Sequence, residues 1–174
     1  MLNRRGFLAA VPIAAFAAGC TAPSGTSSGR QPGSILLGDG YEPESLHPLM
    51  GYAAEGAGKF YDGLLASDGQ GNLTPALAAD QPRPDDEFRT WTVNLRDDVH
   101  FHDGSPFTAE DVAATYRAAI DPAYASTVSS QFSMLAEVRA IDERTVRFDL
   151  ALPYSAWPSK LVLGMVPAAT LQQA

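Results

Sequence analysis

Residues 91–112 read WTVNLRDDVHFHDGSPFTAEDV and carry the clearest structural signals of this 174-residue chain. The first five residues alternate between apolar and polar side chains, which is typical of a strand with one buried face. The Asp-Gly pair at 103–104 predicts a turn. Thr108, followed by two acids, predicts a helix N-terminus, where a hydroxyl caps the free N–H groups and acids favour the positive end of the dipole. Strand, turn and helix are therefore expected in that order.

Further elements are expected on either side of this stretch. The helix should end at Asp121-Pro122, because the residue before a proline avoids helical geometry. Residues 145–150 alternate again and predict a second strand, preceded by a turn at 142–144. The Gly-rich and Asn-rich residues 68–72 predict a hairpin turn, and the proline-rich residues 81–87 predict a surface loop. The apolar stripe of the helix consists of Val112, Tyr116, Ala119 and Ile120.

Three short apolar runs complete the pattern. Residues 34–38 fit a buried strand, and residues 161–166 are a comparable run near the end of the chain. Residues 56–65 place Phe60, Leu64 and Leu65 at helical spacing, with Gly63 as an interruption. Strands mixed with one or two helices predict an α/β or mixed α+β fold.

Composition excludes several classes of protein. The chain is 45% hydrophobic and 18% charged, with one cysteine, which excludes collagen, coiled coils and polytopic membrane proteins. Its 12 basic and 20 acidic residues give a net charge of −8. Because nucleic-acid affinity depends mainly on basic residues that neutralise phosphates, a nucleic-acid partner is not expected.

The N-terminal residues 1–19 have the three-part pattern of an export signal. Arg4-Arg5 precedes an uncharged run from Gly6 to Gly19, and this run is shorter than the roughly 20 residues that a membrane-spanning helix needs. The Arg-Arg-Gly-Phe-Leu string also resembles a twin-arginine export signal. We therefore expect an extracytoplasmic location, either periplasmic or at the outer face of the cell membrane.

Cys20 stands where the apolar run ends. The sequence Ala17-Ala18-Gly19-Cys20 resembles the lipobox of bacterial lipoproteins, in which the cysteine becomes the lipidated first residue. A free thiol in a discarded leader is the alternative. Residues 20–33 are rich in Thr, Ser, Gly and Pro and predict a flexible tether with a reach of roughly 20 Å. Lipidation would anchor the protein to the membrane surface.

The sequence offers little support for catalysis. His100 and His102, with Asp103 beside them, would share one face of a strand and could form part of a zinc site, but the chain has only one further histidine, His47. No nucleophile elbow and no phosphate-binding glycine loop is present in the sequence. We therefore expect no enzyme, no metal site and no cofactor.

Residues 91–112 as a whole resemble the signature of the family 5 extracytoplasmic solute-binding proteins, the peptide, dipeptide and nickel-binding receptors of ABC importers. The resemblance extends over about residues 35 to 170. Its supporting motifs are 44–48 (ESLHP), 60–65 (FYDGLL), 72–78 (NLTPALA), 142–150 with Pro153-Tyr154, and 164–167 (GMVP).

The resemblance implies the N-terminal portion of a two-lobed periplasmic-binding-protein type II fold. Residues 34–55 would supply the first strand and a ligand-side segment of the main lobe. Residues 56–166 would form the small extra α/β domain, and residues 167–174 would return to the main lobe.

One ligand-facing segment is implied by the same resemblance. Tyr41, Glu42, Pro43 and Glu44 match the edge that lies along the bound peptide in peptide-binding members, where backbone pairing gives sequence-tolerant affinity. A simple turn into the first helix is the alternative reading of these residues. His47 departs from the family pattern, because an Asp or Asn is usual there, and this leaves open how the turn is capped.

The predicted function is that of a lipid-anchored receptor that captures small peptides and presents them to ABC permease subunits. A receptor for a nickel chelate or another small solute, and a truncated chain that transports nothing, are the alternatives. The resemblance also implies that Ile35–Leu37 and Leu161–Val166 pair with strands from later sequence. Without those partners, the chain is expected to have low stability or to aggregate through unpaired strand edges.

Overall fold

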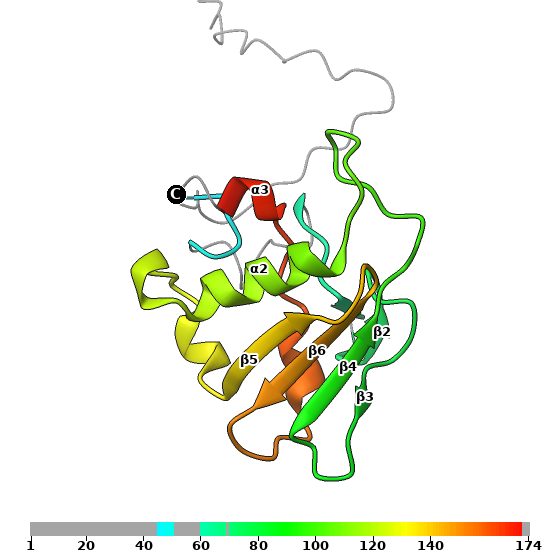
Figure 1. Cartoon of the computed structure of the whole chain (residues 1–174), viewed down its shortest axis with the longest axis vertical. Helices are drawn as coiled ribbons and strands as arrows, with labels where there is room; N and C mark the ends of the chain where they lie inside the picture. Colours follow the sequence, from blue (N-terminus) through cyan, green and yellow to red (C-terminus); the bar gives the residue numbers. More distant parts are fainter. Residues whose placement is uncertain (1–44, 51–59, 69, 172–174) are drawn as a thin grey trace, which may run out of the picture. The chain divides into compact units, whose positions relative to one another are not determined.

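The computed structural model describes residues 45–50, 60–68 and 70–171 (Figure 1). All of them belong to one compact unit, Tyr41–Ala174. The export signal, Cys20, the tether, the strand expected at 34–38 and the ligand-side residues Tyr41–Glu44 lie outside the described residues. Within the described ranges, every helix is too short or too polar to span a bilayer.

Two antiparallel sheets and several short helices make up this unit. The elements are, in chain order, β1 (Leu65–Ser67), β2 (Leu73–Pro75), β3 (Arg83–Pro84), β4 (Thr90–Asn94), α2 (Ala109–Ile120), η1 (Pro122–Tyr124), η2 (Ser129–Phe132), β5 (Leu135–Ala140), β6 (Thr145–Leu150), η3 (Trp157–Lys160) and α3 (Ala168–Leu171), where η marks a 3-10 helix. The larger sheet has the strand order β3-β4-β6-β5. The prediction of a mixed α/β fold is confirmed.

The two strands predicted from alternation lie side by side in the larger sheet. β4 and β6 pair so that Trp91 is opposite Phe148 and Val93 is opposite Val146. These four side chains are buried, while their neighbours along each strand are only partly covered. The sheet therefore has one apolar face and one polar face, as the period of two requires.

Helix α2 covers the apolar face of the sheet, mainly over β5 (Figure 1). It begins after Thr108, as predicted: the Asp111 carboxylate accepts hydrogen bonds from the Thr108 N–H and hydroxyl, both at 2.8 Å. It ends at Ile120, where the Asp121 carboxylate accepts from the N–H of Ala123 at 2.8 Å and starts η1. The predicted helix is confirmed at both ends.

The centre of the core is a cluster of four aromatic rings. It joins Tyr116 of α2, Phe132 of η2, Phe148 of β6 and Trp157 of η3. Tyr116 meets Phe148 edge to face at 5.0 Å and Phe132 at 5.4 Å. The Tyr116 hydroxyl donates to the Lys160 carbonyl, and burial raises the pKa of this phenol. Four separate elements are thus held together at one point.

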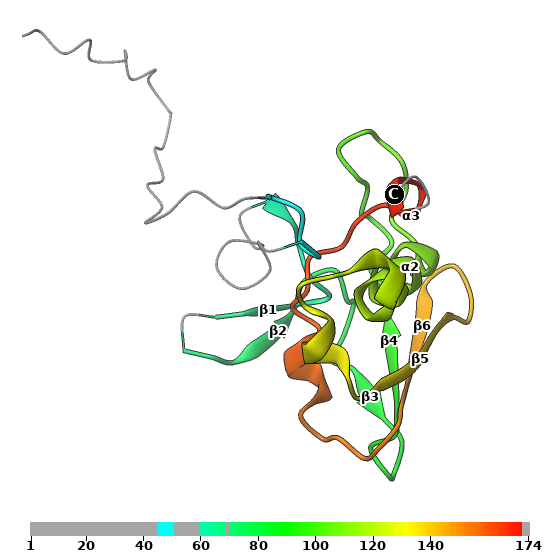
Figure 2. The same ribbon diagram turned by 90° about the vertical axis from the view of Figure 1, so that its left-hand side faces the viewer.

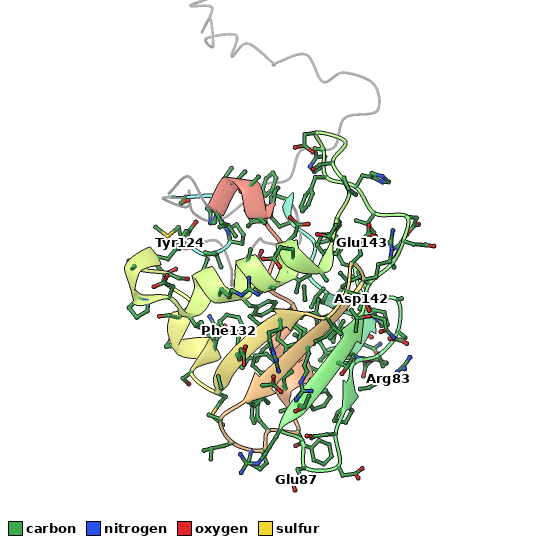
Figure 3. All side chains as sticks on the ribbon, in the orientation of Figure 1. Arg83, Glu87, Tyr124, Phe132, Asp142 and Glu143 are labelled. Carbon is green, nitrogen blue, oxygen red and sulfur yellow. The ribbon has the colours of Figure 1, made fainter. Side chains whose placement is uncertain are left out.

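The predicted hairpin turn at 68–72 and the predicted turn at 142–144 are both confirmed. The Asp68 carboxylate accepts from the N–H groups of Gln70 and Asn72 and from the Asn72 side chain at 2.8–2.9 Å, which joins β1 to β2 (Figure 2). The second turn joins β5 to β6. Its residues Asp142 and Glu143 lie at the opposite end of the sheet from Glu87, at the tip of the β3–β4 hairpin (Figure 3).

Three expected elements differ in the structure. Of the helix expected over 56–65, residues 56–59 lie outside the described residues; residues 61–64 are not helical, and Leu65 begins β1. The loop expected over 81–87 contains the edge strand β3, which pairs with Trp91 and Thr92. Pro84 is compatible with that strand because an edge position does not require its missing N–H. The alternation at 99–102 belongs to a loop that Phe101 closes by donating to the Ser105 carbonyl at 2.9 Å.

Residues 161–166 are buried apart from Val162, and the expectation that they lack neighbours is wrong. Leu161 accepts a backbone hydrogen bond from Leu65 at 2.9 Å, and Met165 donates one to Asp62 at 3.0 Å. The two segments approach so closely that a Cβ atom on Gly63 would lie 2.8 Å from backbone atoms of Val162. Residues 61–65 therefore lie beside residues 161–166 and share two backbone hydrogen bonds with them.

Candidate functional site

The strap, residues 45–50, is the first described part of the chain after the predicted ligand-side residues Tyr41–Glu44. Its backbone is folded tightly around His47. The His47 N–H donates to the Ser45 hydroxyl at 3.1 Å, and Met50 donates to the His47 carbonyl at 3.0 Å. The N–H of Leu49 donates to Nδ1 of the His47 ring at 3.2 Å.

The imidazole of His47 thereby does what an Asp or Asn side chain does in an Asx turn. Such a side chain accepts a hydrogen bond from the N–H two residues further on. His47 makes that bond through a ring nitrogen instead of an oxygen. The departure from the family pattern at this position is therefore compatible with the same turn, which the sequence alone left open.

The strap is fixed to the loop that follows α2. Leu49 is fully buried, and its carbonyl accepts from the Ser126 hydroxyl at 2.8 Å and from the Thr127 N–H at 3.0 Å. The His47 ring lies 6.3 Å from the ring of Tyr124 in η1, which is labelled in Figure 3. Sequence reasoning missed Ser126 and Thr127, since contacts across more than 70 residues have no local sequence signal.

Protonation of His47 is coupled to this geometry. Burial lowers the pKa of His47 below its usual value of 6.5, and the neutral ring leaves Nδ1 free to accept from Leu49. Between the lowered folded pKa and 6.5, the unfolded chain binds more protons than the folded one. The stability that the neutral His47 ring contributes is therefore complete above pH 6.5, and this contribution is lost as the pH falls through the folded pKa.

Substitution of His47 tests this coupling. His47→Asn keeps a side-chain acceptor and should remove the loss of stability that His47 causes between about pH 7.5 and about pH 5. His47→Ala should cost about 1 kcal/mol at the higher pH, because the Leu49 N–H loses its partner. Urea unfolding at both pH values measures the difference. His102→Gln is the control and should keep the dependence; an unchanged pH profile in His47→Asn would contradict the assignment.

A separate cleft of about 300 Å³ opens between four parts of the unit. They are residues 60–62, Leu77, the loop from Val99 to Phe107, and Met165 with Pro167. Leu77, Phe107 and Met165 form a buried apolar floor. Phe101 meets Phe107 edge to face at 5.8 Å. The cleft is therefore apolar at its base and aromatic along one wall.

The three residues weighed as metal ligands all line this cleft, on a loop and not on a strand. The backbone of His100 forms an isolated antiparallel β-bridge with Pro106. The Asp103 carboxylate accepts hydrogen bonds from the Ser105 hydroxyl at 2.6 Å and from the Ser105 N–H at 2.8 Å. The bond from the Ser105 side chain is the main cause that lowers the pKa of Asp103. Within residues 45–50, 60–68 and 70–171, no three His, Cys, Asp or Glu side chains are grouped to hold a metal ion.

Comparison with known sequences identifies one protein family and several related proteins. Residues 72–173 match the family of bacterial extracellular solute-binding proteins, family 5 Middle. Protein XP55 of Streptomyces lividans is 42% identical over 166 residues, which is 94% of this chain and 30% of that protein. The periplasmic oligopeptide-binding protein OppA of Haemophilus influenzae is 35% identical over 114 residues, which is 62% of this chain and 20% of that protein.

Solved structures of similar fold support the same relationship. NikZ of Campylobacter jejuni, in complex with Ni(L-His), has a TM-score of 0.70 and 27% identity over 76% of this chain and 27% of that one. Haemophilus influenzae OppA, in complex with RPPGFSPFR, has a TM-score of 0.68 and 26% identity over 77% of this chain and 30% of that one. The chain thus spans between a fifth and a third of the length of these relatives.

Proposed function

The chain belongs to the bacterial extracellular solute-binding proteins of family 5, and from this premise we propose that it captures oligo- or dipeptides outside the membrane for delivery to an ABC permease. The family consists of binding proteins and not of enzymes, so recognition and release of a solute are the chemistry to be explained. Peptides are proposed as the ligand class because the chain is similar to Haemophilus influenzae OppA, whose structure was solved in complex with RPPGFSPFR.

The geometry of the strap supports a ligand-side role for the residues before it. Tyr41–Glu44 would lie along the bound peptide and pair with its backbone, a mode that tolerates different side chains. Such pairing needs a fixed strand edge. The strap starts directly after these residues, and the hydrogen bonds that Ser126 and Thr127 donate to the Leu49 carbonyl hold it in place.

We extend the proposal to the organisation of the whole receptor. Residues 56–166 would form the small extra domain, and residues 34–55 and 167–174 would belong to the main lobe of a two-lobed receptor. Support comes from the alignment with solved family structures, which covers about three quarters of this chain.

A nickel-chelate receptor is the second candidate function. It is supported by the alignment with NikZ, whose structure contains Ni(L-His). In that case, histidine or aromatic side chains would surround a metal complex, and the ligand would bring its own metal.

A thermal-shift screen distinguishes the two candidates. The 174-residue chain is heated with di- to pentapeptides, with Ni(L-His) and with buffer alone, and Haemophilus influenzae OppA with RPPGFSPFR serves as the positive control. A ligand at about 100 times its dissociation constant adds about 2.7 kcal/mol, which raises Tm by about 5 to 10 °C. Peptide-dependent shifts support the first proposal, and a shift with Ni(L-His) alone supports the second. A flat screen contradicts receptor function for this chain.

The membrane anchor is proposed to be a lipid on Cys20. The acyl chains would hold the body at the outer face of the membrane, and the tether 20–33 would let it stand off by roughly 20 Å. Cys20→Ser should move the protein from the membrane fraction to the soluble fraction, as measured by fractionation of cells that express it. Ser24→Ala, a change within the tether, is the control and should leave the distribution unchanged. A Cys20→Ser variant that stays with the membrane contradicts lipidation.

A further inference from the structure

We infer that the cleft lined by residues 60–62, Leu77, Val99–Asp103, Phe107, Met165 and Pro167 binds a small organic cation with an apolar body, such as an amine that carries one aromatic ring. This inference does not rest on the proposed peptide transport. It follows from the shape, the rings and the charges of the described residues that line the cleft.

The size and floor of the cleft suit a small apolar group. Its volume of about 300 Å³ is at the lower end of the range of about 300–1,000 Å³ that small-molecule sites occupy. The floor of Leu77, Phe107 and Met165 is buried and offers no charged group. A single ring can therefore leave water and contact aliphatic, aromatic and thioether surface.

The rim of the cleft favours a positive charge. Asp62 and Asp103 are both exposed lining residues, and no lysine or arginine of the described residues lines the cleft. Hydrogen bonds from Ser105 lower the pKa of Asp103, which keeps this carboxylate ionised at neutral pH. Asp62 makes no side-chain hydrogen bond to the described residues. The pKa of Arg96 is raised mainly by its hydrogen bond with Asp98 and to a smaller extent by the charge of Asp62, and Arg96 is already paired with Asp98 at 2.7 Å.

The aromatic walls add to this preference. Phe60, Tyr61 and Phe101 line the cleft, and the negative face of an aromatic ring attracts an ammonium group. Anions, in contrast, would face two carboxylates, and the imidazoles of His100 and His102 are the basic side chains among the described lining residues. Aromatic walls, an apolar floor and an acidic rim together match an organic ammonium ion better than a neutral or acidic solute.

A matched set of probes tests the inference. Phenethylammonium carries both a ring and a cation, phenylacetate replaces the cation with an anion, and ethylammonium lacks the ring. Each is titrated into the 174-residue chain with ¹³C-methyl methionine and ¹⁵N labels. We expect saturable shifts at the Met165 methyl and the Phe101–Phe107 amides with phenethylammonium alone, with a dissociation constant on the order of 1 mM. Met134, which does not line the cleft, is the internal reference.

Charge-neutralising variants complete the test. The double variant Asp62→Asn/Asp103→Asn should weaken phenethylammonium binding at least about fivefold, because asparagine keeps the acceptor for Ser105 but removes both charges. Asp86→Asn, which makes one such change at the exposed tip of the β3–β4 hairpin, should have no effect. Equal binding of phenylacetate, or shifts outside the cleft, would overturn the inference. Changes in the Met165 methyl chemical shift that grow with protein concentration in the absence of any probe would also overturn the inference, because a second copy of the chain would then occupy the cleft.

Discussion

Replacing Trp157 with alanine is expected to lower the free energy of unfolding by about 3–5 kcal/mol, the usual cost of deleting a large aromatic side chain from a packed core. Trp157 is fully buried. Its ring lies 5.6 Å from Phe148, 6.4 Å from Phe132 and 6.5 Å from Tyr116. The cavity would separate η3 from the sheet and from α2, so the surroundings have little freedom to collapse into it.

Two further variants define this effect. Trp157→Phe should lower the free energy of unfolding much less. The indole Nε1 has no hydrogen-bond partner among the described residues, so replacement by the smaller phenyl ring breaks no hydrogen bond. Leu152→Ala removes an apolar side chain that is 56% exposed and should change stability by no more than about 0.5 kcal/mol. Urea unfolding followed by tryptophan fluorescence and circular dichroism measures all three. Equal losses in Trp157→Ala and Leu152→Ala would contradict the central role of the cluster.

Gly164→Ala is expected to cost about 3 kcal/mol through steric conflict. A Cβ atom at residue 164 would lie 2.5 Å from Cβ of Tyr61 and 3.3 Å from Cβ of Pro48. Neither neighbour can move away by side-chain rotation alone, since a Cβ atom is fixed by its own backbone. The segment 161–166 would have to separate from residues 61–65, which breaks the hydrogen bonds of Leu161 and Met165.

Gly71→Ala is the matched glycine control. Gly71 has φ of +87° and nothing within 4 Å of the added Cβ, so alanine there meets backbone strain but no crowding. It should cost about 1 kcal/mol, clearly less than Gly164→Ala. Chemical unfolding of both variants gives the ranking. If Gly71→Ala proves the more damaging of the two, the close crossing at Gly164 is not a major constraint.

Sequence reasoning succeeds where local patterns are regular. The strand that begins near Trp91, the strand 145–150 and the helix after Thr108 are all predictable, because burial on one side imposes a period of two on strands and a cap marks a helix start. The strand β5 is not predicted. A bulge between Leu135 and Glu137 places the buried residues Leu135 and Val138 three positions apart, so the period of two is broken.

The candidate site is only partly predictable for a different reason. His47 stands out as unusual in the sequence, and yet its acceptor role for Leu49 and the anchoring by Ser126 depend on contacts that only the folded chain creates. The cleft likewise combines residues from four distant parts of the sequence. His100 and His102 have the spacing of metal ligands on a strand, and the structure instead places them on the wall of an apolar cleft.

The close approach of residues 61–65 and 161–165 has a consequence for how this body can be joined to other polypeptide. The Met165 N–H and the Asp62 carbonyl are 3.0 Å apart, so the chain enters and leaves the intervening segment at the same place. Residues 62–165 therefore meet the geometric condition for a domain inserted into a host loop, which requires adjacent ends. A host protein could accept this segment without separating the two residues that flank the insertion point.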